Sequence, residues 1–404
     1  MQKSEGAVIH MNRDEIRYLV GEGEMDVNPL PVYSELVCDF LDQLSKRLRN
    51  DREARFFPDI LTFAFWCRKA NITQQKEAYH TPVARMGRGM AFHIAPSNVP
   101  VNFAFSLAWG MLAGNGNVVR VSNKDYRQTE IICRILRELL QDEKYALLKK
   151  QTQVVSYGHK KEINDFYSQN CAVRVIWGGD HAIWEIRMSE IPARCVELTF
   201  ADRVSFAIFD EAYMVNLQKE QMKQLAEKFY NDTYLMDQNA CSSPHLILWQ
   251  NCTKDHAGRR LFWSEVVAAA EKYDLPEKKV LDKYTMLCEQ AALTGDIIAV
   301  NRFKNRLYVA ELKGLPERIE DYRGKFGLFY ETDIRELEEI CESITPKIQT
   351  CVTYGVDHQK LQKILMEHHV QGVDRIVSVG DAMNLGMFWD GYDVIGSMSR
   401  GIVV

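Results

Sequence analysis

Hydrophobic positions in the first half of the chain follow two alternating kinds of spacing. Between residues 33 and 48 apolar side chains recur every three or four positions, which predicts a helix. Short runs rich in β-branched residues follow, each succeeded by a helical pattern, at 90–95, 118–121, 154–156 and 173–177. Strands that alternate with helices predict right-handed βαβ units and a mainly parallel sheet. Before residue 80 we expect an opening pair of strands and then helices.

The same alternation returns in the second half of the chain. A helical pattern at 217–234 lies between apolar runs at 204–209 and 246–249. Further strands are expected at 307–309, 326–330, 349–353 and 375–379, and further helices near 256–272, 279–294, 333–343 and 357–369. These elements predict a second α/β unit, with the boundary near Asp210-Glu211. The fold class is therefore α/β, without internal repeats.

Composition narrows the class of protein. Of the 404 residues 46% are hydrophobic and 26% are charged, and the net charge is −5, which is typical of a globular protein. Without a basic tract we expect no nucleic-acid partner. The most apolar window, Val99 to Gly114, is too short to span a bilayer and contains Pro100, so it predicts a buried helix. Ten cysteines without C-x-x-C spacing argue against a metal site, and a polar N-terminus without a signal sequence indicates a cytoplasmic protein.

One cysteine stands in a segment suited to chemistry. Cys241 lies among small and polar residues in Asp237-Gln-Asn-Ala-Cys-Ser-Ser-Pro-His245, between a predicted helix and a predicted strand. In such a tight connection a thiol can point into a cleft, and backbone N–H groups can stabilise an anion. The alternative is a buried structural cysteine, which is the commoner role of a free cysteine.

Two turns after predicted strands carry polar groups. Asn98 follows the strand that begins at Met90, and Pro96 and Pro100 stiffen its loop, so its amide could serve as an oxyanion donor. An Asx turn is the alternative. Gly178-Gly179 lies at a strand-to-helix turn whose N–H groups would favour phosphate, although most such glycines are only turn residues. The dinucleotide motif G-x-G-x-x-G is absent.

These pieces together resemble the aldehyde dehydrogenase superfamily. Residues 94–100 resemble its strand and loop with the oxyanion asparagine, and 116–122 resemble its next strand, which holds the cofactor ribose. Trp177 to Asp180 falls at its phosphate-side turn, and Gln238 to Cys241 resembles the segment of its catalytic cysteine. Ala-Cys-Ser-Ser-Pro at 240–244, Val-Ser-Phe-Ala at 204–207 and Trp-Asp-Gly-Tyr-Asp at 389–393 resemble the LuxC-type acyl-CoA reductases. The resemblance covers roughly residues 80–404.

The resemblance implies a fold and a set of roles. It implies two doubly wound, mainly parallel-sheet domains with the active site between them. An N-terminal helical segment and a nucleotide-binding domain would take 1–210, a catalytic domain 211–375, and 376–404 would return to the nucleotide-binding domain. The implied catalytic residues are Cys241, Asn98 and Glu197, and the implied cofactor-binding residues are Pro96, Ser97, Arg120, Ser122, Gly178 and Gly179.

Two departures from the family pattern shape the predicted chemistry. Arg120 replaces the usual strand-end lysine and could bind a 2′-phosphate, so we expect NADPH, with NADH as the alternative. Glu-Leu-Gly-Gly, which carries the deacylating base of aldehyde-oxidising members, is at best Glu197-Leu-Thr-Phe200, and Glu197 could instead be a surface charge or a helix-cap residue.

The predicted activity is reduction of a fatty acyl thioester to an aldehyde through an acyl-cysteine. The alternatives are an aldehyde-oxidising dehydrogenase and a non-catalytic scaffold for an acyl-protein synthetase. An acyl-protein synthetase or an acyl carrier protein could be a partner, and the resemblance implies a homo-oligomer.

Overall fold

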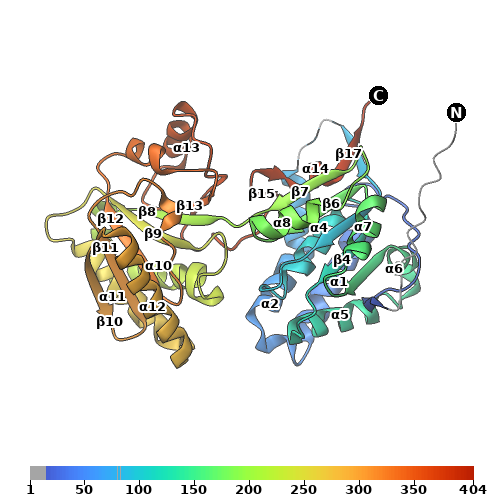
Figure 1. The fold of residues 1–404 in the computed structure, drawn as a ribbon, viewed down its shortest axis with the longest axis horizontal. Coiled ribbons are helices and arrows are strands. Elements are labelled where there is room, and N and C mark those ends of the chain that lie inside the picture. Colours follow the sequence, from blue (N-terminus) through green and yellow to red (C-terminus); the bar gives the residue numbers. More distant parts are fainter. Residues whose placement is uncertain (1–14, 80, 82) are drawn as a thin grey trace. The chain divides into compact units, whose positions relative to one another are not determined.

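The structure is a computed structural model that describes residues 15–79, 81 and 83–404. The chain forms two compact units, and each is considered by itself (Figure 1). The first unit takes the chain up to Ala201 and also Gly386–Phe388 and Tyr392–Val404; the second takes Asp202–Leu385 and Trp389–Gly391. The division precedes the expected boundary at Asp210-Glu211, because strand β8 (Val204–Asp210) pairs only within the second sheet. The functional roles expected for the two domains stay predictions.

The first unit is built on a six-stranded sheet with the order β1-β5-β4-β3-β6-β7. The strands are β1 (Arg17–Val20), β3 (Met90–Ile94), β4 (Gly116–Val121), β5 (Thr152–Ser156), β6 (Val173–Trp177) and β7 (Val196–Phe200). All neighbours are parallel except β1, which runs antiparallel to β5. From β3 the chain first winds outward through β4 and β5 and then returns to the other side with β6 and β7. The strand order therefore switches between β3 and β6, which is where open α/β sheets bind ligands.

Helices connect these strands in the expected alternation. They are α1 (Glu35–Asn50), α2 (Pro58–Trp66), α3 (Lys69–Ala78), α4 (Asn102–Leu112), α5 (Arg127–Leu139), α6 (Ala146–Lys150), α7 (Lys161–Asn170) and α8 (Asp180–Arg187). Helix α4 is buried from Phe103 to Leu112, as its uncharged and largely apolar sequence predicts. Of the expected opening strand pair, β1 pairs with β5 instead of with a neighbouring strand, and residues 1–14 lie outside the described residues.

The C-terminal segment adds small elements. Strand β17 (Ser399–Ile402) pairs antiparallel with β2 (Ala84–Gly87), and the short helix α14 (Val394–Met398) precedes it. Strands β15 (Phe388–Trp389) and β16 (Tyr392–Asp393) form a separate two-stranded ladder.

The second unit has a seven-stranded sheet with the order β10-β11-β12-β9-β8-β13-β14. Besides β8 its strands are β9 (Pro244–Gln250), β10 (Ile297–Phe303), β11 (Leu307–Leu312), β12 (Leu328–Asp333), β13 (Ile348–Tyr354) and β14 (Arg375–Ser378). Only β10 runs antiparallel to its neighbour. The helices are α9 (Glu211–Val215), α10 (Lys219–Thr233), α11 (Ala257–Ala269), α12 (Glu277–Thr294) and α13 (His358–Glu367).

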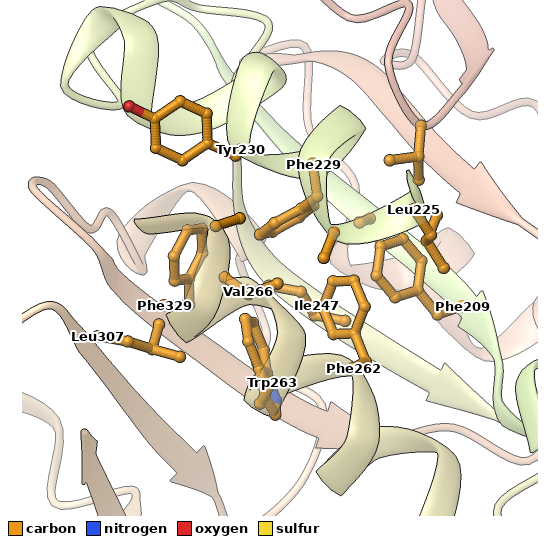
Figure 2. Packing of buried hydrophobic residues seen from close by; sticks show 14 of the residues in the cluster. Phe209, Leu225, Phe229, Tyr230, Ile247, Phe262, Trp263, Val266, Leu307 and Phe329 are labelled. Atoms are coloured by element: carbon orange, nitrogen blue, oxygen red, sulfur yellow. The ribbon is translucent and has the colours of Figure 1, made fainter. Parts of the chain in front are cut away.

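Aromatic side chains fill one core of the second unit. Phe229 of α10 lies edge-on to Phe209 and to Phe262 of α11, with ring centroids 6.0 and 5.2 Å apart, and Figure 2 shows these rings packed over Ile247 of the sheet. Edge-to-face rings add to the stabilisation from burial, which is about 1.5–3 kcal/mol for each large apolar side chain. The helical spacing in α10 and the continuous apolar run in β9 together produce this layer.

Several elements differ from the expectation, among them strand β7, which was not expected. The helix expected at 333–343 is a 3₁₀ segment over Leu337–Ser343. Strand β10 was not expected, because nearly all of its residues are exposed and show no apolar alternation. No helix in the described part of the chain is long and apolar enough to cross a membrane.

Candidate active site

Cys241 lies in a turn at the amino end of β9, in the second unit. The turn follows the 3₁₀ segment Tyr234–Met236 that extends α10. Cys241 is partly buried, and its carbonyl accepts a 2.6 Å hydrogen bond from the hydroxyl of Ser205 on β8. The helix-to-strand connection predicted from the sequence is therefore present, and it places the thiol at the amino edge of the sheet.

Hydrogen bonds hold this turn on both sides of the thiol. Gln238 is buried, and its side chain accepts from the N–H of Gly327 at 2.7 Å and donates to the Leu328 carbonyl at 3.1 Å. Ser243 donates to the Asp232 carbonyl at 2.7 Å. Gly327 has φ +86°, and a Cβ there would lie 2.4 Å from the Arg306 carbonyl, so this approach requires glycine. The turn is thus fixed against α10 and the start of β12.

The electrostatic surroundings raise the pKa of the Cys241 thiol. Burial has the largest effect, because it removes water from the thiolate, and the backbone N–H of Arg203 opposes it by donating toward sulfur. The Arg203 side chain pairs with Asp374 and lies 3.6 Å from the Asp390 carboxylate. The resting side chain is therefore a thiol, and its attack on a substrate must be accompanied by loss of the proton.

Neighbouring candidates for nucleophile or base do not compete with Cys241. Cys252 lies just past the carboxyl end of β9. Because β9 has seven residues, the strand separates Cys252 from the turn of Cys241 by about 23 Å. Burial and Asp333 raise the pKa of Cys252 to about 12. His245 is buried, its Nδ1 lies 2.8 Å from the Gly324 carbonyl, and burial lowers its pKa to about 4. It is therefore a neutral structural residue.

A group of possible metal ligands lies beside Cys252. Glu211, Cys252 and His256 bring their ligand atoms within 4.8 Å of one another. The Glu211 carboxylate already accepts from the N–H groups of Thr253 and Arg259, both at 3.2 Å. The Arg259 guanidinium lies 3.5 Å from the Cys252 sulfur, where it would repel a cation. These contacts give Glu211 a structural partner set, and they provide no argument for a metal.

In the first unit, Asn98 lies in the loop after β3. The side chains of Ser97 and Asn98 are exposed, and Pro96 is partly buried. Helix α5 and the residue before it hold this loop: the Tyr126 hydroxyl donates to the Ser97 carbonyl at 2.8 Å, and the Thr129 hydroxyl donates to the Pro100 carbonyl at 3.2 Å. The backbone is fixed while the amide of Asn98 stays available at the carboxyl edge of the sheet.

Arg120, near the end of the adjacent strand β4, carries donors suited to an anion. Its guanidinium carbon lies 5.0 Å from the centroid of the Tyr157 ring, which follows β5. The Nε atom of Arg120 is buried and has no hydrogen-bond partner among the described residues. Ser122 follows in the chain, and its hydroxyl accepts from the Lys124 N–H at 3.2 Å. The unsatisfied donor and the stacked guanidinium suit the phosphate or ribose of a nicotinamide cofactor.

Gly178 and Gly179 lie after β6, across the switch point from the Asn98 loop. Gly179 caps α8, and the N–H of Gly178 donates to the Phe200 carbonyl at 3.1 Å. A Cβ added to Gly179 would meet no atom within 4 Å, and one on Gly178 would only touch Ala182 at 3.4 Å. Neither glycine is required by packing, so open space lies beside this turn. That space suits a cofactor phosphate approaching the backbone.

Glu197 does not join these residues. It is the second residue of β7 and pairs in register with Arg174, whereas Thr199 pairs with Ile176 near the carboxyl edge. Its two oxygens accept from Arg174 Nε and Arg187 Nε, each at 2.7 Å. The Arg174 side chain is almost wholly buried. Glu197 therefore neutralises a buried arginine, and its expected role as a catalytic base stays a prediction without support from this geometry.

The carboxyl ends of three neighbouring strands gather the other candidates of the first unit. Pro96, Ser97 and Asn98 follow β3, Arg120 and Ser122 end β4, and Gly178 and Gly179 follow β6. Cys241 belongs to the second unit. Sequence reasoning missed the residues that fix its turn, because Ser205, Gln238 and Gly327 act through contacts between distant segments. The one signal available in the sequence was Gly327 itself, because a glycine can adopt the positive φ that this position requires.

Comparison with known proteins identifies the family of this chain. Residues 28–295 match the family described as acyl-CoA reductase (LuxC). The chain belongs to the LuxC acyl-CoA reductase family. This membership places the protein among the oxidoreductases, and it confirms the resemblance seen in the sequence. No curated protein sequence matches the chain.

Solved structures confirm the expected aldehyde dehydrogenase fold. Aldehyde dehydrogenase 21 from Physcomitrella patens, in complex with the reaction product succinate, is similar with a TM-score of 0.63 and 11% identity, over 90% of this chain and 84% of that one. An NAD-dependent benzaldehyde dehydrogenase from Corynebacterium glutamicum gives a TM-score of 0.59 at 14% identity over 90% and 81%. An oxidoreductase from Marinobacter aquaeolei gives 0.61 at 12% over 95% and 88%. At these identities the likeness concerns the fold alone.

Proposed function

We propose that the protein reduces a fatty acyl thioester, either acyl-CoA or an acylated protein, to the aldehyde with NADPH. The acyl group is carried on Cys241. The observation that supports this most strongly is the turn at the amino end of β9, where a partly buried cysteine stands in a segment held by side chains on both sides. Membership of the acyl-CoA reductase family supports the same reaction class.

Acylation begins at the thiol. Cys241 loses its proton as it attacks the thioester carbonyl, and the N–H of Arg203 stabilises the developing thiolate. The Asn98 amide and the Cys241 N–H stabilise the tetrahedral oxyanion. Collapse of this intermediate expels the carrier as a thiolate, which takes up a proton in place of the one that Cys241 lost, and leaves the acyl group on the Cys241 sulfur. Because burial raises the pKa of Cys241, the acylation rate should increase with pH through the neutral range.

Reduction completes the cycle. When bound, a reduced nicotinamide supplies the hydride that this step requires. Arg120 binds the 2′-phosphate, and Pro96, Ser97, Ser122, Gly178 and Gly179 line the rest of the cofactor site. The thiohemiacetal on Cys241 then collapses to the aldehyde and frees the thiol. No residue needs to activate water, so the pairing of Glu197 with two arginines is compatible with this cycle.

The experiment that tests this function is intact mass measurement. The protein is mixed with a panel of acyl-CoA thioesters without cofactor, and we expect a mass increase of one acyl group on Cys241. Adding NADPH should remove the group and release aldehyde. Rapid hydrolysis to free acid would favour the aldehyde-oxidising alternative. Absence of any adduct across the panel would favour the non-catalytic scaffold.

A further inference from the structure

Helix α2 (Pro58–Trp66) exposes a face without charge. Pro58, Thr62 and Phe65 are exposed and Leu61 is partly buried, and their spacing of three and four residues puts them on one stripe. The opposite side of the helix, with Ile60 and other apolar residues, is buried. A surface helix of a globular protein normally turns charged and polar residues outward. This stripe therefore lacks the partner that such a face would require.

Two exposed phenylalanines lie in this part of the chain. Phe65 is 47% exposed, and Phe56, which lies just before α2, is 75% exposed. We call Phe56, Pro58, Leu61, Thr62 and Phe65 the α2 face.

Arginines surround both rings. The guanidinium carbons of Arg68 and Arg49 lie 4.9 and 5.9 Å from the Phe65 ring centroid. That of Arg55 lies 5.7 Å from the Phe56 centroid, and the Arg55 Nε donates to the Arg52 carbonyl at 3.0 Å. The aliphatic stems of such arginines cover apolar surface while their charged ends stay in water.

The nearby acids do not neutralise these arginines. Asp51 accepts from Arg134 at 2.9 Å, and Glu53 pairs with Arg127, so α5 takes up both carboxylates. Asp59 accepts from the Gln128 amide at 3.2 Å. Among the described residues no ion pair involves the arginines that rim the α2 face, Arg49, Arg52, Arg55 and Arg68. The rim therefore keeps a positive charge.

We propose that the α2 face docks on an anionic lipid surface. Phenylalanine rings enter the boundary between headgroups and acyl chains, and arginines bind the lipid phosphates with paired N–H groups. The cationic rim of the α2 face is complementary in charge to such a surface. This inference is independent of the reaction proposed for Cys241, since none of these residues belongs to that site.

The test measures binding of the full-length protein to vesicles. Sedimentation is compared between vesicles of phosphatidylcholine alone and vesicles that also contain phosphatidylglycerol. We expect binding only to the second kind, weakening as salt is raised. Phe56→Ser with Phe65→Ser should reduce the bound fraction at least tenfold. Each of Arg49→Gln, Arg55→Gln and Arg68→Gln should weaken binding by about fivefold.

Matched controls separate this face from general effects. Lys219→Gln, Lys223→Gln and Lys254→Gln remove exposed charges elsewhere, and Leu293→Ser removes a leucine that is 83% exposed. These variants should bind vesicles as the parent protein does, and thermal unfolding checks that every variant is folded. Absence of binding to phosphatidylglycerol vesicles, or equal weakening by the controls, would overturn the proposal. It would also be overturned if the phenylalanine variants changed only the oligomeric state, because a second copy would then cover the face.

Discussion

The two sheet edges that carry candidate residues differ in how their polar groups are satisfied. At the amino edge of the second sheet, the turn of Cys241 is fixed by Ser205, Gln238 and Ser243 through bonds inside the unit. At the carboxyl edge of the first sheet, the Asn98 side chain is exposed and Arg120 keeps a buried donor without a partner. The first pattern suits a nucleophile that must hold one position. The second suits a surface that a ligand completes.

Glu197 differs from the other candidate residues of the first sheet. It lies on the first sheet, but its oxygens are taken up by Arg174 and Arg187. Asn98, after β3, and Arg120, on β4 of the same sheet, have groups to spare for a ligand, and Glu197 has none. Whether the polar groups of a residue already have hydrogen-bond partners therefore separates the candidate residues more clearly than their position in the family pattern does.

The largest expected effect is on the nucleophile of the second sheet. Cys241→Ser should abolish reductase activity, a loss of about 10⁴-fold or more, because a serine hydroxyl is essentially un-ionised at neutral pH. Activity is followed as loss of NADPH absorbance with an acyl-CoA substrate. Cys252→Ser is the matched control and should remain active. Near-normal turnover of Cys241→Ser would show that Cys241 is not the nucleophile.

The next effect tests the open edge of the first sheet. Asn98→Ala should lower kcat by about 10²–10³-fold, because one oxyanion donor is lost. Binding of NADPH, measured by fluorescence titration, should change little. If Asn98 instead serves only an Asx turn, thermal stability will fall while kcat stays within a few-fold.

Arg120, at the edge of the first sheet, is expected to determine the preference for NADPH over NADH. Arg120→Ala should raise KM for NADPH about tenfold to a hundredfold more than KM for NADH, since a lost charged hydrogen bond costs about 1.5–3 kcal/mol. Steady-state kinetics with both cofactors measures the ratio. Equal losses with the two cofactors would indicate a contact with their shared ribose or a structural role.

Substitution of Glu197 should lower the stability of the protein and change its activity little. Glu197→Gln leaves the buried Arg174 without its counter-charge, so the free energy of unfolding should fall by up to about 3–5 kcal/mol. The reductive rate below the melting temperature should stay within about tenfold, or about 1.4 kcal/mol in barrier. Denaturant titration and initial rates measure the two quantities. A collapsed rate in a stable variant would make Glu197 a proton donor or a positioning residue.

The smallest effect on turnover is expected at Asp232, which anchors the second unit. Burial raises its pKa to about 7, although its carboxylate accepts from the N–H groups of Gly380 and Ala382. Between about pH 4 and 7 the unfolded chain releases a proton that the folded chain keeps, so stability falls as pH rises. Asp232→Asn should flatten melting temperature against pH across this window. An unchanged slope would show that Asp232 ionises normally in the fold.

Local patterns predicted much of the architecture. The apolar spacing of α1 and α10, the β-branched runs of β4 and β6 and the position of Cys241 between helix and strand all follow from neighbouring residues. The uncharged and largely apolar sequence of α4 likewise indicated a buried helix. Exposed β10 escaped prediction, because it carries no regular apolar period of its own, and the helix expected at 333–343 is a 3₁₀ segment over Leu337–Ser343.

Only the tertiary structure decided which polar residues are free. Glu197 and Arg120 both stand on strands of one sheet, and nothing next to them in sequence distinguishes their states. Arg174 is far enough from Glu197 along the chain that only strand pairing in register brings them together. Tyr157, likewise distant, takes the face of the Arg120 guanidinium and leaves its Nε unsatisfied. Hydrogen bonds act over about 3 Å in space, so the partners of a side chain depend on how distant segments pack.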